Sequence, residues 1–223
     1  QYADFTGRAR RKEYWMFVGN PGAGKSTIIN SLLKQKLAQA GSSIGEGLTK
    51  KFALYPHENI TYVDTPGLDD IRNRAEAAKE IEKALKQNGK YRIFFILKPD
   101  SLKVKKADLD TIEKVLDAIT CPNIEFNILV NQLTKRDKKT LNSGSEKSNF
   151  YSYLQAGKYK KSKITFIDLD TAVQDGDSEF LNMDDFLNFA DMDSASMHIP
   201  QNCIGTVDGE SQEEKLEKAR KEL

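Results

Sequence analysis

Histidine, cysteine and long apolar runs are all scarce in this 223-residue sequence. Its two histidines, His57 and His198, are too few for a histidine-based metal cluster. Its two cysteines, Cys121 and Cys203, lie far apart without metal-ligand spacing, which argues against a disulfide scaffold and suits a reducing compartment. No apolar run approaches the roughly 20 residues that a membrane-spanning helix needs. We therefore expect a cytoplasmic protein.

An excess of charge of either sign is also missing. Lysine and arginine number 34 and aspartate and glutamate number 33, so the net charge gives no sign of binding to nucleic acid or to an acidic surface. The length suffices for one α/β domain with some additions. The chain begins at Gln1 without a methionine, and we expect the natural N-terminus to lie upstream.

Residues 19–26 are the stretch that carries recognisable chemistry. They read Gly-Asn-Pro-Gly-Ala-Gly-Lys-Ser, which fits the phosphate-binding P-loop pattern. A buried strand is predicted before them at 14–18 and an amphipathic helix after them at 27–38. Such a turn binds anions because backbone N–H groups converge on it and the helix dipole favours negative charge. Lys25 is predicted to reach the β- and γ-phosphates and Ser26 to ligate Mg²⁺. The predicted nucleotide contacts here are Asn20, Pro21, Gly22, Ala23, Gly24, Lys25, Ser26 and Thr27.

Strand and helix patterns alternate along the rest of the chain. Strands at 51–55 and 59–63, joined by a turn at 56–58, are expected to pair as an antiparallel hairpin. A helix is predicted at 75–88 with Gly89 as its C-cap. The remaining predicted elements are a strand at 91–97, a helix with apolar positions from Leu109 to Ile119, a strand at 124–130, a polar loop at 131–148, a short helix at 150–155, a strand at 163–169 and helical patterns at 184–189 and 211–223. This order predicts a three-layer α/β P-loop NTPase fold, with a mostly parallel six-stranded sheet, one antiparallel strand and helices on both faces.

A second motif follows the predicted hairpin. Residues 64–68 read Asp-Thr-Pro-Gly-Leu, directly after a strand. In parallel sheets the carboxyl ends of the strands meet at one edge, where the P-loop also lies. Asp64 is therefore placed to hold Mg²⁺, usually through water, and Gly67 allows a backbone N–H to approach a γ-phosphate. Asp-x-x-Gly alone is common, but after a strand and a P-loop it is a strong signal.

Together these motifs resemble those of the translation-factor-related (TRAFAC) class of P-loop GTPases. The nearest resemblance is to septins, chloroplast import (Toc) receptors and immunity-associated GTPases, over residues 13–170. It is carried by residues 19–27, by Gly-Leu-Thr-Lys at 47–50 and by residues 64–68. The resemblance implies a G domain that binds GTP or GDP with Mg²⁺.

The same resemblance implies roles for single residues. Thr49 corresponds to a switch I threonine, which would join Mg²⁺ and the γ-phosphate in the triphosphate state only. The implied metal ligands are Ser26, Thr49 and Asp64, and the implied catalytic residues are Lys25 and Thr49. The resemblance also divides the chain into a basic N-terminal arm at 1–12, a P-loop GTPase domain at 13–172 and a C-terminal extension with weak helices at 173–223.

The base-recognition motif departs from the family pattern. The family places Asn or Thr, Lys, any residue and Asp just after the fifth strand, where the Asp carboxylate accepts two N–H donors of guanine. Asn131 directly follows the predicted strand but has neither Lys nor Asp in register, whereas Thr134, Lys135 and Asp137 match the pattern three residues late. The chemistry favours the later register, with Asn131 as an alternative contact. The segment near 169–172 would supply the second base contact and has no recognisable motif.

The residue that would orient the attacking water is a second departure. Where small GTPases place a glutamine, this chain has Leu68, which cannot hydrogen-bond. A backbone group, a switch residue or a partner in a homodimer formed through the nucleotide face must then position the water. We expect a GTP-binding switch with slow, Mg²⁺-dependent hydrolysis. The alternatives are a non-hydrolysing scaffold that dimerises or recruits partners, and an ATP-dependent P-loop enzyme.

Residues 5–17 carry a separate likeness. They are similar to the cytoplasmic start of an unrelated small bacterial inner-membrane family of unknown function. In that family the segment leads into a membrane span, whereas here it leads into the P-loop, so no membrane function is transferred. The basic cluster at 8–12 is interpreted as a solvated arm.

Overall fold

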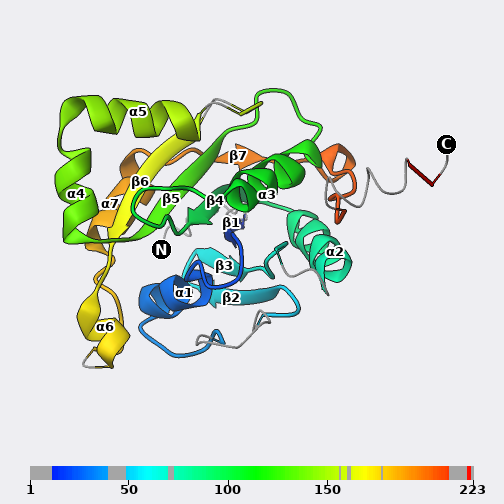
Figure 1. The fold of residues 1–223 in the computed structure, drawn as a ribbon. Coiled ribbons are helices and arrows are strands. Elements are labelled where there is room, and N and C mark those ends of the chain that lie inside the picture. The colour runs from blue at the N-terminus through cyan, green and yellow to red at the C-terminus, as the bar shows by residue number, and fades with distance from the viewer. Residues whose placement is uncertain are drawn as a thin grey trace, which may run out of the picture.

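A seven-stranded mixed sheet forms the centre of the molecule (Figure 1). The computed structural model of the chain describes residues 12–39, 49–69, 73–155, 157–159, 162–176, 178–210 and 220–221. The strands are β1 (Glu13–Val18), β2 (Ala53–His57), β3 (Ile60–Asp64), β4 (Lys90–Leu97), β5 (Phe126–Leu133), β6 (Ser162–Asp168) and β7 (Met197–His198). Six of them lie in the order β2-β3-β1-β4-β5-β6, and β7 pairs with β4. All neighbours pair in parallel except β2 with β3 and β7 with β4.

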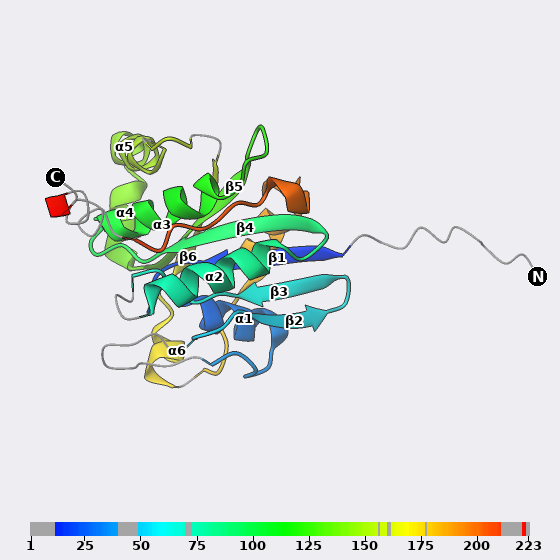
Figure 2. The ribbon, with the colours of Figure 1, turned by 90° about the vertical axis from the view of Figure 1, so that its right-hand side faces the viewer.

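Helices cover both faces of this sheet, as the two views show (Figures 1 and 2). One face packs against α2 (Arg74–Leu85), α3 (Lys106–Asp117), α4 (Lys135–Leu141) and α5 (Gly144–Leu154). The other packs against α1 (Lys25–Leu33) and α7 (Asp184–Met192). A short α6 (Thr171–Asp175) and a 3₁₀ helix (Gln201–Cys203) lie in the connections. The predicted fold class is confirmed, and the sheet gains β7, whose two residues are too few to show a strand pattern.

The two cores follow from the alternation of side chains along buried strands. In β1, Tyr14, Met16 and Val18 enter the core under α2 and α3, whereas Trp15 and Phe17 enter the core under α1 and α7. Both sets are at most 5% exposed, because a central parallel strand is covered on each face. The nearly continuous apolar runs that predicted these strands are therefore the residues of two separate cores.

Helix α7 belongs to the second of these cores. The Phe186 ring lies 6.1 Å from that of Trp15, 6.3 Å from that of Phe17 and 5.1 Å from that of Phe94, between centroids. Phe186 is 1% exposed. The division of the chain at residue 172 stays a prediction, but a helix from beyond that point packs directly on the central strands.

Two predicted helix ends are wrong. Helix α1 stops at Leu33 rather than at residue 38, because Lys34 takes a left-handed conformation with φ 52° and caps the helix. Leu37, which lies within the range predicted for that helix, is 55% exposed. Helix α2 ends at Leu85 with Lys86 as its C-cap, so Gly89 does not cap it. A Cβ at Gly89 would instead lie 2.4 Å from the Lys12 carbonyl oxygen.

The predicted polar loop at 131–148 is also wrong. Strand β5 continues to Leu133, α4 begins two residues later, and α5 fills residues 144–154 in place of the short helix at 150–155. The hairpin of β2 and β3 is confirmed, with its turn shortened to Glu58 and Asn59. The helix predicted at 211–223 lies outside the described residues except for 220–221, and the arm predicted at 1–12 lies outside them except for residue 12. Gly47 and Leu48 of the Gly-Leu-Thr-Lys segment also lie outside the described residues.

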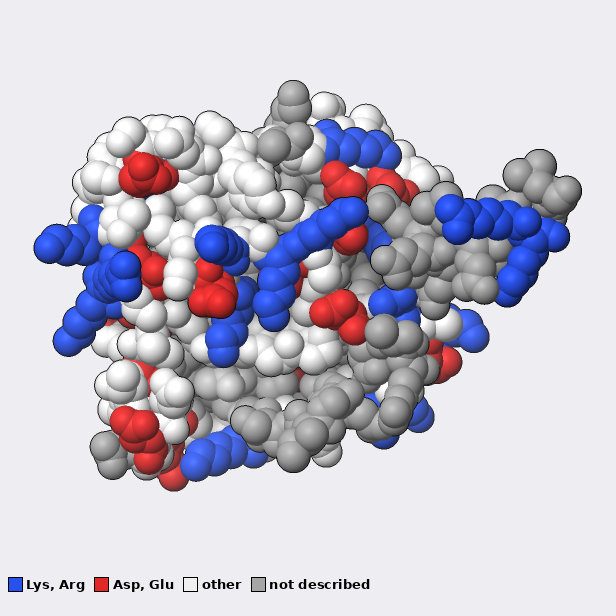
Figure 3. Space-filling view, in the orientation of Figure 1, with Lys and Arg blue, Asp and Glu red and all other residues white. Residues whose placement is uncertain are grey.

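Basic and acidic side chains are interspersed over the face drawn in Figure 3, in keeping with the net charge of +1. Among the described residues, the helices are all too short or too polar to cross a lipid bilayer.

Candidate functional site

The P-loop connects the end of β1 to the start of α1. Gly22 and Gly24 have φ angles of 78° and 96°, a left-handed conformation that glycine adopts without strain. Gly24 is the N-cap residue of α1, and a Cβ there would lie 2.5 Å from Asn131 Nδ2. The Ala23 N–H donates to the Asn20 carbonyl at 3.1 Å and closes the turn. The turn therefore presents the N-terminus of α1 at the carboxyl edge of the sheet, the geometry of an anion site.

Lys25 opens α1 and lies over this turn. Its Nζ donates to the Gly19 carbonyl at 2.7 Å and to the Asn20 carbonyl at 3.3 Å, and the residue is 7% exposed. Burial lowers the pKa of the ammonium, whereas the carboxylates of Asp64 and Asp108 oppose this effect. The site thus holds a shielded positive charge against carbonyl groups that a phosphate oxygen could replace as partners.

Three oxygen-bearing side chains from separate segments meet beside this lysine. Ser26 Oγ donates to Asp64 Oδ2 at 2.8 Å, Thr49 Oγ1 lies 3.4 Å from the same oxygen, and the two hydroxyls are 3.5 Å apart. Asp64 is 1% exposed and its Oδ1 has no hydrogen-bond partner. Burial raises the pKa of this carboxyl, although Lys25 and the two hydroxyls act in the opposite direction.

These contacts decide whether the three predicted metal ligands, Ser26, Thr49 and Asp64, fit Mg²⁺. The ion is hard and prefers oxygen donors, of which it usually takes one or two from carboxylates and the rest from hydroxyls, water and phosphates. The structure brings the three side chains together, and the buried, unpartnered Oδ1 of Asp64 is an oxygen that a cation would satisfy. The donor set therefore fits magnesium and could hold it.

The segment after Asp64 lies directly against the P-loop. A Cβ at Gly67 would meet the Pro21 nitrogen at 2.7 Å and the Asn20 carbonyl carbon at 3.0 Å, so only glycine fits this approach. Thr65 Oγ1 donates to the Phe17 carbonyl at 2.8 Å and fixes the segment to β1. Leu68 is 3% exposed and packs into the core with α2. Its side chain is apolar as well as buried, so it offers no polar group to an attacking water.

On the side expected to hold the base, Asn131 contacts the P-loop. It is 2% exposed, its Nδ2 donates to the Ala23 carbonyl at 2.8 Å, and its Oδ1 accepts from the Gln132 N–H at 2.9 Å. Gln132 has φ 63°, and the pairing of β5 with β6 shifts register between Val130 and Leu133. This irregularity lies at the end of β5, where Asn131 contacts the P-loop.

Asp137 caps a helix. It forms a capping box at the start of α4: Thr134 Oγ1 accepts from the Asp137 N–H at 3.1 Å. The Asp137 Oδ2 in turn accepts from the Thr134 N–H at 3.1 Å and the Thr134 hydroxyl at 2.7 Å. Lys135 is exposed in the first turn of the same helix. The match to the base motif at 134–137 is thus also a helix N-terminal cap.

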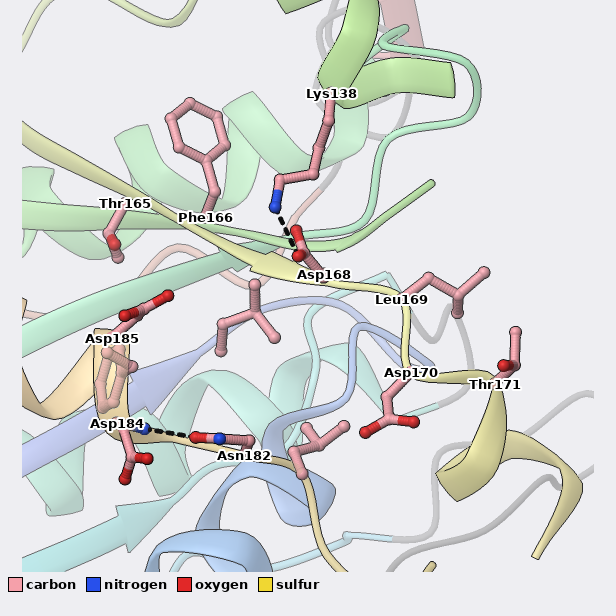
Figure 4. A pocket seen from close by; sticks show the side chains of 13 residues that line it. Lys138, Thr165, Phe166, Asp168, Leu169, Asp170, Thr171, Asn182, Asp184 and Asp185 are labelled. Atoms are coloured by element: carbon pink, nitrogen blue, oxygen red, sulfur yellow. Dashed lines mark hydrogen bonds and ion pairs between the residues drawn. The ribbon is translucent and has the colours of Figure 1, made fainter. Parts of the chain in front are cut away.

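A cavity of about 690 Å³ lies between the end of β6 and the start of α7 (Figure 4). Residues 169–171, part of the segment expected near the base, line one side of it. Asp170, Asp184 and Asp185 stand around it, and Lys138 is paired with Asp168 at 2.5 Å. Asp170 also accepts from the Ala172 N–H at 3.0 Å and so caps α6. This acidic lining is unsuited to phosphate.

Two buried polar residues of α3 reach the P-loop without any motif to mark them. Asp108 and Thr111 hydrogen-bond the two ends of the Asn20 side-chain amide. In the sequence they are two polar residues in a helix with charged neighbours, and no spacing distinguishes them. Thr27, which was predicted as a nucleotide contact, is half-buried in the first turn of α1, directly after Ser26.

The fold and the site define a class of protein. A P-loop at the carboxyl edge of a mainly parallel sheet, with a buried Asp at the end of β3 hydrogen-bonded to the P-loop serine, is the arrangement of a P-loop nucleoside triphosphatase.

The family can be stated more narrowly. A family model described as "50S ribosome-binding GTPase" matches residues 14–132, more than half of the chain, and the chain belongs to this GTPase family. This confirms the resemblance seen in the motifs. Guanine nucleotide, as GTP or GDP with Mg²⁺, is accordingly the cofactor.

Relatives among the curated proteins agree with this family. The probable GTP-binding protein EngB of Mycoplasmoides gallisepticum is 30% identical over 135 residues, covering 58% of this chain and 68% of that protein. GTPase Era of Campylobacter lari is 32% identical over 142 residues, covering 62% of this chain and 46% of that protein. Cell division control protein 10 of Candida albicans is 27% identical over 173 residues, covering 63% and 45%. The chain thus spans about half the length of the last two relatives.

Solved structures share the fold. An Era variant from Aquifex aeolicus bound to GDP and AlF₄⁻ superposes with a TM-score of 0.55 at 16% identity, covering 88% of this chain and 62% of that one. Toc33 from Arabidopsis thaliana in complex with Mg²⁺ and GMPPNP gives a TM-score of 0.54 at 14% identity, covering 85% and 88%.

Proposed function

We propose that the chain is a nucleotide-dependent switch that hydrolyses GTP slowly with Mg²⁺. The observation that carries this proposal is the meeting of Ser26, Thr49 and the buried Asp64, whose Oδ1 has no hydrogen-bond partner, beside Lys25. Membership of a GTPase family supports the nucleotide. Bound Mg²⁺ would supply positive charge to the β- and γ-phosphate oxygens.

In this proposal the chain's own groups stabilise the charge that develops on the γ-phosphoryl group. Lys25 and the N–H groups at the start of α1 face the phosphates, in a buried setting where such contacts are strong. Gly67 brings its backbone to the same edge. Leu68 is buried and apolar, so hydrolysis lacks a side chain at that position to orient water, and slow turnover follows.

The switch itself is assigned to Thr49 and Gly67. Thr49 Oγ1 lies 3.4 Å from Asp64, a longer contact than the 2.8 Å from Ser26. We therefore assign Thr49 as the more loosely held ligand, which joins the site with the triphosphate and leaves it with the diphosphate.

On the base side we assign the main contact to Asn131. It is buried, and its amide already supports the P-loop. Thr134 directly follows the last residue of β5, but Asp137 Oδ2 already accepts from the Thr134 N–H and hydroxyl, so a guanine base at this register would compete with the cap of α4.

A second copy of the chain is the proposed source of the missing water-orienting group. One solved structure of this fold, at 17% identity and a TM-score of 0.50, is described with the words "Dimerization is important for the GTPase activity of chloroplast translocon components". The burial of Leu68 also favours a second candidate, a nucleotide-binding scaffold that does not turn over.

Single-turnover release of phosphate, measured as a function of protein concentration, separates these candidates. A rate that rises with concentration supports a GTPase completed by a second copy. A measurable rate independent of concentration supports a slow monomeric GTPase. Nucleotide binding without phosphate release at any concentration would refute hydrolysis and leave the scaffold.

Ribosome binding is not extended to this chain. The family description names the 50S ribosomal subunit, and an Era structure of the same fold contains nucleotides 1506–1542 of 16S ribosomal RNA. The net charge of +1 supplies no basic excess for such a partner.

A further inference from the structure

A buried polar network behind the P-loop has no part in the chemistry described so far. Asn20, Asp108 and Thr111 are 6%, 5% and 3% exposed. Asn20 Nδ2 donates to Asp108 Oδ1 at 2.8 Å. Thr111 Oγ1 lies 3.0 Å from Asn20 Oδ1 and 2.9 Å from the Ala107 carbonyl oxygen, so its one proton is shared between these two acceptors. Both ends of one amide are therefore held by α3, across 88 and 91 positions of sequence.

The backbone of Asn20 faces the other way, into the phosphate site. Its carbonyl accepts from Lys25 Nζ at 3.3 Å and from the Ala23 N–H at 3.1 Å. Its carbonyl carbon lies 3.0 Å from the position that a Cβ of Gly67 would take. One peptide thus touches the lysine, the turn of the loop and the Gly67 segment, so its placement sets how these three groups meet.

A carboxylate at position 108 is energetically unfavourable, because it is buried. Burial raises the pKa of Asp108, and the nearby charge of Asp69 adds to this, while the bond from Asn20 and the charge of Lys105 oppose it. An apolar side chain would avoid the desolvation of a charge, so packing alone does not account for Asp108. Its acceptor oxygen is what Asn20 Nδ2 needs.

We propose that Asp108 and Thr111 are positioning residues for the γ-phosphate half of the site. They hold the Asn20 amide so that its peptide keeps Lys25 and Gly67 in register. Neither touches the nucleotide. This inference rests on the proposed function, because it assumes that Lys25 and Gly67 act on the γ-phosphate.

The proposal predicts a selective loss. In the proposed function the β-phosphate is held mainly by backbone N–H groups at the start of α1, from Gly24 to Ser26, whereas the γ-phosphate depends on Lys25 and Gly67 together. Loosening Asn20 should therefore weaken binding of a triphosphate more than binding of GDP, and should slow turnover. A residue with a purely structural role would affect both nucleotides alike.

The experiment measures the dissociation constants of GDP and of the non-hydrolysable GTP analogue GMPPNP, with Mg²⁺, together with single-turnover phosphate release. The main variant is Thr111→Val, which keeps the shape of the side chain and removes the donor. Asp108→Leu removes the acceptor, and Asp108→Asn restores an oxygen in the same place. Asp110→Asn is the control, since Asp110 is a half-buried acid of the same helix outside the network.

We expect Thr111→Val and Asp108→Leu to weaken GMPPNP binding and slow release by about tenfold, the effect of one lost buried hydrogen bond. Binding of GDP should change by less than about twofold, Asp108→Asn should recover most of the loss, and Asp110→Asn should match the wild type. If Asp108→Leu fails to fold, Thr111→Val decides alone.

Equal losses for GDP and GMPPNP, or wild-type values for both, would overturn the inference. The ratio of the two dissociation constants does not depend on turnover. If the wild-type protein binds both nucleotides but releases no phosphate, the proposed hydrolysis is refuted. The ratio of the two dissociation constants would then still test the positioning role of Asp108 and Thr111. A wild-type protein that binds neither nucleotide would refute both.

Discussion

Asp64 is the residue whose surroundings bear most directly on the chemistry. It is a buried carboxylate with one oxygen bonded to Ser26 and the other without a partner. Such a charge is costly in a folded protein unless a cation or donor satisfies it. The position therefore trades stability for a place where a cation can bind.

A substitution at Asp64 should separate these two effects. In Asp64→Asn we expect Mg²⁺ to lose its effect on GTP binding, with affinity lowered by at least about tenfold, because the ligand charge is gone. The unfolding midpoint of the nucleotide-free protein should stay the same or rise, because a buried charge is removed. Titration of GTP with and without Mg²⁺, beside thermal unfolding, measures both. Retained Mg²⁺ dependence would exclude Asp64 as a ligand.

Asp108 leads to a prediction about pH. Its pKa is raised above its usual 3.8, first by burial and then by Asp69, so between the two values the folded state binds more protons than the unfolded state. Stability contributed by this group therefore falls as pH rises above 3.8. Asn at this position does not titrate. The free energy of unfolding of Asp108→Asn, relative to the wild type, should increase with pH and then level off.

Urea unfolding of the nucleotide-free proteins between about pH 4 and 8 measures this difference. The charged groups that face Asp108 are Lys105, Lys25 and Asp69, and they are common to both proteins. Their own titration therefore largely cancels in the comparison. A difference that stays constant over this range would contradict the raised pKa.

Asn131 and Asp137 should respond differently to substitution. Asn131→Ala removes a buried amide that supports the P-loop, and we expect nucleotide affinity to fall about tenfold. Asp137→Asn alters a capping box, with an expected loss of about 0.5–1 kcal/mol in the free energy of unfolding and unchanged preference for guanine. Competition binding with GTP and ATP measures nucleotide affinity and guanine preference, and urea unfolding measures the free energy of unfolding. A loss of guanine preference in Asp137→Asn alone would return the base contact to the later register.

At the scale of elements, α4 shows why part of the site escaped prediction. Its sequence, Lys-Arg-Asp-Lys-Lys-Thr-Leu, has no apolar stripe, and within the helix only Asp137 and Leu141 are buried. A helix of this kind is specified by its N-terminal cap rather than by periodicity. The same Thr-x-x-Asp spacing that matched a base motif is that cap. The Thr-x-x-Asp spacing was visible in the sequence, but it fits both a base-recognition motif and a helix N-terminal cap.

The predictions that succeeded rest on stronger local signals. The P-loop and the Asp64 segment each follow a buried apolar strand, and the sheet places both at one edge. The end of β5 was placed too early because Asn131 and Gln132 are polar, yet they continue the strand toward the P-loop. Asp108 and Thr111 could not have been found, since their role depends on a contact across about 90 residues.

Helix α7 carries a prediction about the extent of the fold. Phe186→Ala removes a ring that is 1% exposed among Trp15, Phe17 and Phe94, and should lower the free energy of unfolding by about 3–5 kcal/mol. Leu187→Ala is the matched control, because Leu187 is 36% exposed on the same helix, and should cost below about 1 kcal/mol. Denaturant unfolding measures both. Equal, small effects would mean that α7 is not part of the cooperative core.

At the scale of the whole molecule, the sheet acts as the frame that gathers distant segments. The P-loop follows β1, Asp64 ends β3 and Asn131 lies near the end of β5, so the parallel order of these strands brings them to one edge. Helix α3 supports the P-loop through the hydrogen bond between Asp108 and the Asn20 side chain. We propose that these segments together form one site, at one edge of the sheet, for a guanine nucleotide with Mg²⁺.

Competition between GTP and ATP for the full chain tests this central claim most directly. A fluorescent GDP analogue is bound in the presence of Mg²⁺ and displaced by each nucleotide in turn. We predict that GTP displaces it at concentrations at least about 100-fold lower than ATP, as a site that hydrogen-bonds its base should. Displacement by both nucleotides at equal concentrations would contradict a guanine-selective site, and the central claim with it.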